Sequence, residues 1–244
     1  MEQVSAAAPH GAEHEATTTG IDHRKMLVWA FLGSDCMFFG SLIATYLVYK
    51  DKSLSGPLPL DVFDIPVTSV STFVLLMSSM SMVMAYAAIS RGSLKGFRIW
   101  ILSTALMGMT FLAFQVFEFH DFANHEVHLT CAGLDLDELT ALERKVAEGC
   151  SQPGVTEVFD DKNGLTPRTN LFGTTFFTLV GFHGAHVTIG IIWLLSLFFY
   201  SFRQQATTGR SLDVDLAALY WHFVDVVWIV IFTVIYLLGV FEGF

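Results

Sequence analysis

The chain has 244 residues, of which 53% are hydrophobic and only 15% are charged, and its mean hydropathy is +0.54. A soluble domain carries about 25% charged residues, so this composition excludes an ordinary soluble globular protein and indicates a protein that crosses a membrane several times. The net charge of -10 does not suit a nucleic-acid-binding surface, and we expect no nucleic-acid partner.

The first 23 residues contain few side chains that a fold could bury. The segment MEQVSAAAPHGAEHEATTTG has neither the basic start nor the short apolar region of a secretory signal. We expect a disordered tail over residues 1–23, followed by a membrane domain over residues 24–244. His10 and His14 are expected to be solvated tail residues and not metal ligands.

Five apolar runs follow, and each exceeds the roughly 20 residues that a helix needs to cross a bilayer. They are Leu27–Tyr49, Pro66–Ser90, Phe97–Phe119, Leu171–Phe202 and Leu219–Phe241. No proline interrupts the middle of a run. The sequence therefore predicts an all-α membrane protein with five transmembrane helices in one bundle. We expect Trp29, Trp100, Tyr200, Tyr220 and Trp221, near the run ends, at the membrane interface.

Basic residues predict the orientation. The short loop Arg91–Arg98, RGSLKGFR, has three basic residues and no acid, and positive charges in short loops remain in the cytoplasm. This places the N-terminus in the cytoplasm and the C-terminus outside. The long acidic loop at residues 121–170, between the third and fourth helices, then lies outside and includes a segment patterned as a short amphipathic helix.

The three cysteines fall into two groups. Cys131 and Cys150 lie in the outer loop, where an oxidising compartment would favour a disulfide between them; two free thiols are the alternative. Cys36 lies in the first helix, and we expect it to be buried and unreactive.

The first helix carries one acid, Asp35, among its apolar residues. Gly33, Gly40 and Ser41 give it a face of small residues, which suits contact between helices in lipid. The serines of the second helix, among them Ser78, indicate close packing as well. Burial in lipid favours the protonated form of Asp35 and a hydrogen bond to a neighbouring helix.

Each of the last three helices carries two polar residues three positions apart. The pairs are Gln115 with Glu118, His183 with His186, and His222 with Asp225. Residues at this spacing share a helix face, and buried polar groups need hydrogen-bond partners. The carboxylates and the amide complement the imidazoles, so the sequence predicts one inward-facing network of all six residues.

Four interpretations of this network fit the residue types. It is a structural packing network, a metal site, a haem site with two histidine ligands, or a proton or ion pathway in a transporter. A three-residue histidine spacing without a longer motif is a weak metal signal. The residues alone favour the packing network.

Several segments resemble subunit III of haem-copper terminal oxidases. FGTTFFTLVGFHGAHVTIG and YWHFVDVVWIVIFTVIYLLG are similar to the last two helices of that family, and LGSDCMFFGSLIATYLVY and FQVFEF are similar to earlier helices. The resemblance covers residues 26–121 and 168–241. It implies a five-helix, non-catalytic subunit of a bacterial aerobic respiratory oxidase, which spans the bacterial inner membrane. Such a cytochrome c oxidase reduces oxygen to water and conserves energy as a proton gradient.

The resemblance also implies partners and local roles. Haems and copper would be bound by partner subunits, with no redox centre and no metal in this chain. The partners would be the catalytic subunit I, subunit II and, as a further candidate, subunit IV, together with bound phospholipid. Asp35 matches the carbodiimide-reactive carboxylate of the family, and Arg203 matches a residue that binds a lipid headgroup. The subunit would support proton uptake and oxygen supply to subunit I.

The chain departs from the family pattern in two places. Many members have seven helices, whereas we expect five here, without counterparts of the first two. The outer loop is also long, and its acidity would suit a basic cytochrome c or another respiratory complex, with a solvated insert as the alternative. Within the family, the alternatives are a subunit of a quinol oxidase and an accessory protein of a nitric-oxide reductase. An independent membrane transporter is the alternative from another class.

Overall fold

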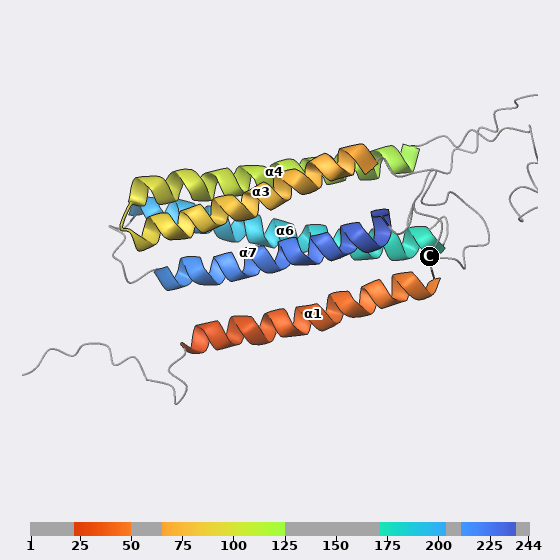
Figure 1. Ribbon diagram of the computed structural model, residues 1–244, viewed down its shortest axis with the longest axis horizontal. Coiled ribbons are helices and arrows are strands. Elements are labelled where there is room, and N and C mark those ends of the chain that lie inside the picture. Colours follow the sequence, from red (N-terminus) through yellow and green to blue (C-terminus); the bar gives the residue numbers. More distant parts are fainter. Residues whose placement is uncertain (1–21, 50–64, 125–170, 204–210, 238–244) are drawn as a thin grey trace, which may run out of the picture.

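The structure of the chain is a computed structural model that describes residues 22–49, 65–124, 171–203 and 211–237. These residues form only helices (Figure 1). The helices are α1 (His23–Tyr49), α3 (Ile65–Ser90), α4 (Leu94–Asn124), α6 (Leu171–Arg203) and α7 (Ser211–Ile231), which continues into the π-helical turn η2 (Phe232–Leu237). Five spans are long and apolar enough to cross a membrane. The predicted five-helix membrane bundle is confirmed.

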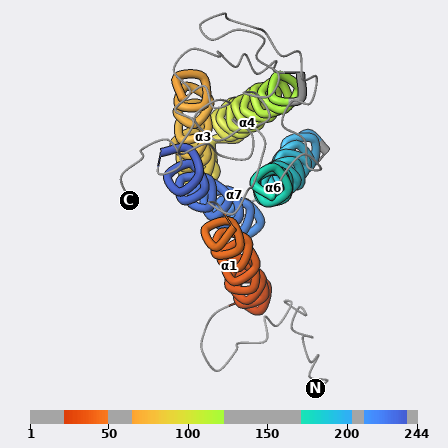
Figure 2. Tube along the Cα trace, turned by 90° about the vertical axis from the view of Figure 1, so that its right-hand side faces the viewer, coloured from red at the N-terminus to blue at the C-terminus, as the bar shows by residue number. Residues whose placement is uncertain are grey.

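Four helices make the body of the bundle, and α1 lies at its edge. Viewed along the helices, α3, α4, α6 and α7 surround a common core, whereas α1 lies to one side against α6 and α7 (Figure 2). Only 6% of the most apolar window of α1 is buried, against 50% for the last span. α1 is therefore held by a narrow inward face, which includes Asp35, Phe39 and Tyr46.

The last helix begins at Ser211 and not at Leu219 as the hydropathy run predicts. Its first turns contain Asp213, which suits the positive end of a helix dipole. Because the helix begins earlier, Trp221 and Tyr220 lie well inside it, and both are buried, at 1% and 4% exposed. Their predicted place at the membrane interface is wrong.

The connection between α3 and α4 is a tight turn at Arg91–Ser93. Gly92 adopts a φ of 77° there, a left-handed conformation that glycine reaches without strain. At its other end α4 extends to Asn124, so the first positions of the expected outer loop are helical. The tail with His10 and His14, and the loop with Cys131 and Cys150, lie outside the described residues.

The face of small residues on α1 does not pack against another of the described helices. A Cβ atom at Gly33 or Gly40 would have no neighbour within 4 Å, and Ser41 is exposed. Cys36 is also exposed, which corrects the expectation that it is buried. The reason is the position of α1 at the edge of the bundle, where most of its circumference has no neighbour within the described part of the chain.

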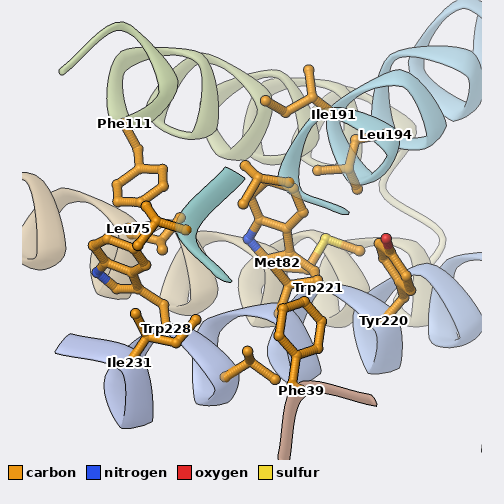
Figure 3. Packing of buried hydrophobic residues seen from close by; sticks show 14 of the residues in the cluster. Phe39, Leu75, Met82, Phe111, Ile191, Leu194, Tyr220, Trp221, Trp228 and Ile231 are labelled. Carbon is orange, nitrogen blue, oxygen red and sulfur yellow. The ribbon is translucent and has the colours of Figure 1, made fainter. Parts of the chain in front are cut away.

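The core depends on one large ring between two glycines. A Cβ atom at Gly108 of α4 would lie 2.6 Å from Trp221, and one at Gly190 of α6 would lie 2.9 Å from the same ring. The indole nitrogen of Trp221 donates to the Ser78 hydroxyl of α3 at 3.0 Å. Trp221 and Trp228 lie in the core near Met82, Phe111 and Ile191 (Figure 3). Trp221 thus joins four helices, and the predicted packing role of the α3 serines is confirmed at Ser78.

We expect Gly190→Ala to lower the free energy of unfolding by about 1–3 kcal/mol, because the added methyl group overlaps the Trp221 ring. Gly33→Ala, which places the same methyl group in open space, is the matched control. Thermal unfolding of the two purified variants in detergent measures the difference. Equal stability of the two variants would contradict the proposed packing of Trp221.

Candidate functional site

An acid of α1 meets a histidine of α6 in the middle of the bundle. Asp35 Oδ2 lies 3.1 Å from His186 Nε2. His186 Nδ1 lies 2.8 Å from the carbonyl oxygen of Phe182, and because a carbonyl only accepts, Nδ1 carries a proton. The Asp35–His186 approach is a close polar contact, and Asp35 Oδ2 is not aligned for a hydrogen bond to the imidazole ring. It brings the acid of α1 within 3.1 Å of a titratable side chain on α6.

A tyrosine of α7 completes this junction. The Tyr220 hydroxyl donates to the backbone carbonyl of His186 at 3.0 Å, and its ring stacks on Phe31 of α1 at 6.4 Å between centroids. The ring of Phe39 contacts that of His186 edge to face at 5.1 Å. Three helices therefore meet around the Asp35–His186 pair, which the sequence did not predict because Tyr220 was expected at the interface.

The polar pair of α7 faces α3. Asp225 Oδ2 is hydrogen-bonded to the Ser79 hydroxyl, and the same hydroxyl lies 3.1 Å from His222 Nδ1. Asp225 is buried, at 4% exposed, whereas His222 is half-buried. Ser79 therefore joins the two residues that the sequence pairs by their spacing.

The two polar residues of α4 have different partners. Thr68 of α3 donates to Glu118 Oε1 at 2.7 Å, and the buried Tyr236 of η2 also interacts with Glu118. Gln115 donates through Nε2 to the backbone carbonyl of Val180 on α6 at 3.0 Å. Both residues join helices, but neither reaches the histidines of α6 through a side-chain hydrogen bond among the described residues.

His183 lies apart from these contacts. It is fully buried, and neither ring nitrogen has a hydrogen-bond partner among the described residues. Its ring stacks on Trp228 at 4.9 Å between centroids and contacts Phe111 edge to face at 6.0 Å. Positions 183 and 186 are rotated by about 60° around the helix, which directs His186 to α1 and His183 into an aromatic core.

The six residues thus form separate local contacts and not one network. Each contact links two or three helices: α1 with α6, α3 with α7, α3 with α4, and α4 with α6. No group of three His, Cys, Asp or Glu side chains converges on one point in the part of the chain that the structure describes.

The helix ends carry ionic contacts that sequence reasoning missed. Lys25 of α1 pairs with Asp215 of α7 at 2.7 Å, and Arg24 lies 3.4 Å from Asp213. In the sequence, the only indication of these contacts is the position of the charges. Two basic residues precede the first apolar run, Leu27–Tyr49, and two acidic residues precede the last, Leu219–Phe241.

Arg98, one of the three basic residues that predict the orientation, also makes specific contacts. It donates to the hydroxyl and the carbonyl of Ser201 at 3.0 and 2.6 Å, and its guanidinium lies 4.2 Å from the centroid of the Phe202 ring. Arg203 is the last residue of α6, and its side chain lies outside the described part of the structure.

Comparison with known proteins gives consistent matches. The family described as cytochrome c oxidase subunit III matches residues 161–240. The chain is 33% identical over 231 residues to the cytochrome c oxidase subunit 3 of Bacillus sp. strain PS3, covering 95% of this chain and 93% of that protein. It is 34% identical over 211 residues to the quinol oxidase subunit 3 of Bacillus subtilis strain 168, covering 86% and 85%. It is also 34% identical over 212 residues to the cytochrome bo(3) ubiquinol oxidase subunit 3 of Pseudomonas putida, covering 87% and 84%.

The two histidines of α6 are expected to respond differently to the same substitution. His183→Phe keeps aromatic packing and removes no hydrogen bond within the described structure, so it should change the free energy of unfolding by less than about 1.5 kcal/mol. His186→Phe leaves Asp35 without its partner and should cost about 1–3 kcal/mol. Unfolding of both variants in detergent tests this, and an equal loss for His183→Phe would mean that its ring nitrogens have a functional partner.

Proposed function

The chain belongs to the subunit III family of haem-copper terminal oxidases, and from this premise we propose how its polar residues serve an oxidase. It is a non-catalytic, multi-pass protein of the bacterial inner membrane that associates with other oxidase subunits. We propose that it stabilises the catalytic subunit I as a rigid membrane bundle and supports proton uptake and oxygen supply there. The observation that carries this proposal is that the intramembrane acids Asp35, Glu118 and Asp225 each contact a polar side chain on a helix of this chain other than their own.

We propose that no redox centre is bound by this chain and that haems and copper are held by partner subunits I and II. The chemistry of the histidines supports this. His186 uses both ring nitrogens, one on Phe182 and one on Asp35. His183 is enclosed by aromatic rings, so neither is presented as a free ligand to a haem iron. Subunit IV remains a further candidate partner.

Lipid is the second proposed partner. α1 leaves most of its apolar surface uncovered by this chain, with Leu27, Trp29 and Met37 among the most exposed side chains. Acyl chains would cover such a surface, and oxygen partitions into them. Arg98 donates to Ser201 through two of its nitrogens, and by resemblance to the family Arg203, at the end of α6, is the proposed phosphate-binding residue.

Cytochrome c is the proposed electron donor of the complex, and quinol is the alternative. The relatives include both kinds of oxidase subunit, at 33% and 34% identity, and the donor site would lie on other chains. The outer loop, outside the described residues, stays a proposed contact for cytochrome c or another respiratory complex. The relatives named above are all oxidase subunits, so the transporter alternative loses its support.

We expect Asp35→Asn to abolish carbodiimide labelling while leaving assembly and initial oxygen consumption nearly intact. The amide keeps a polar side chain beside His186 Nε2, so α1 stays docked, but the reactive carboxyl is gone. Peptide mapping of the labelled complex measures this, with Glu118→Gln as the control that should retain the label. Labelling at Glu118 in the wild-type complex would contradict the assignment to Asp35.

The donor is tested on the purified complex. We expect oxygen consumption with reduced cytochrome c, and little with a quinol. Preferential turnover with the quinol would replace the cytochrome c proposal by the quinol oxidase alternative, without changing the role of this subunit.

A further inference from the structure

The contact between α3 and α7 contains an acid, Asp225, that the proposed function treats only as a link between helices. Asp225 is joined to the Ser79 hydroxyl, and Ser79 to His222 Nδ1 at 3.1 Å. The three side chains form a continuous hydrogen-bonded chain from a buried carboxyl group to a half-buried imidazole.

The number of protons allows two orders of donors and acceptors along Asp225, Ser79 and His222. A serine hydroxyl has a single proton to donate. In the first order, Ser79 donates to an Asp225 carboxylate and accepts from Nδ1–H of His222. In the second order, a protonated Asp225 donates to Ser79, and Ser79 donates to His222 Nδ1, so the neutral imidazole carries its proton on Nε2.

The surroundings of Asp225 favour the second order. Its other oxygen, Oδ1, is buried and has no hydrogen-bond partner among the described residues. A carboxylate spreads its charge over both oxygens, so an uncovered oxygen costs an anion far more than it costs the carbonyl of a neutral acid.

Among the described residues, neither α3 nor α7 contains a lysine or arginine to compensate a charge on Asp225, and the basic side chain linked to it through Ser79 is His222. Titratable side chains of other helices make contacts elsewhere, among them Asp35 with His186, Glu118 with Thr68, and Lys25 with Asp215. His183 stacks on Trp228.

We propose that Asp225, Ser79 and His222 form a proton-binding site within the membrane, in which Asp225 holds the proton and His222 exchanges it with the bundle surface. On release, the Asp225 proton passes to Ser79 Oγ, the Ser79 proton passes to His222 Nδ1, and the Nε2 proton leaves to an outside acceptor. The products are an Asp225 carboxylate, an intact hydroxyl and a neutral imidazole with its proton on Nδ1. One proton leaves, and no electron moves.

Infrared spectroscopy of the purified complex, with this chain labelled by ¹³C at the aspartate carboxyl groups, tests the site. The C=O stretch of a protonated acid is separate from the bands of ionised carboxylates and shifts in D₂O. At neutral pH we expect a band of this kind that disappears in Asp225→Asn and is retained in Asp35→Asn. Ser79→Ala should keep the band, move it to higher frequency and slow its hydrogen–deuterium exchange by about tenfold, because the relay to His222 is cut.

Ser196→Ala is the matched control, since its hydroxyl bonds to the Trp193 carbonyl of its own helix, and it should leave both band and exchange rate unchanged. If Asp225→Asn fails to assemble, the shift in Ser79→Ala still identifies the band. Intensity lost by Asp225→Asn from the ionised carboxylate region, or unchanged exchange in Ser79→Ala, would overturn the proposal. The site belongs to this chain, so neither result depends on whether cytochrome c or quinol is the donor.

Discussion

A polar side chain in hydrocarbon is costly to leave without a partner, and contacts between such side chains join helices of the bundle at several points. An unsatisfied group there costs several kcal/mol, whereas a hydrogen bond between membrane helices contributes only about 0.6 kcal/mol on average. The contacts of Asp35, Glu118 and Asp225 therefore fix the register of the helices more than they add stability. Close packing joins the helices as well, as where Trp221 lies between Gly108 and Gly190.

The same constraint explains how a peripheral helix stays attached. α1 buries little apolar surface against the rest of the chain, and its contacts are placed at three heights. Lys25 pairs with Asp215 at one end, Asp35 pairs with His186 near the middle, and the buried Tyr46 packs against Phe172 near the other end. A helix anchored in this way keeps its position while most of its surface remains available for lipid or for a neighbouring subunit.

Run length was enough to predict the five helices, because a bilayer requires long apolar segments regardless of what surrounds them. It did not place the start of α7, since a hydropathy window excludes Asp213 although the helix terminus and Arg24 stabilise it. For the same reason Trp221 was expected at the interface. Residue spacing predicted that His222 and Asp225 act together, and they do so through Ser79. Spacing could not separate His183 from His186, because which side of a helix faces a neighbour depends on where that neighbour lies.

The most direct test of this account is a double-mutant cycle on Asp35 and His186, measured as the free energy for dissociating the subunit from the purified oxidase with detergent. The cycle compares four proteins: wild type, Asp35→Leu, His186→Phe and the double variant. A direct polar contact between the two side chains predicts a coupling energy of about 0.6–1.7 kcal/mol, so the second substitution should cost little once the first is made. Additive effects of the two substitutions, within about 0.3 kcal/mol, would show that the acid and the histidine do not hold α1 against α6.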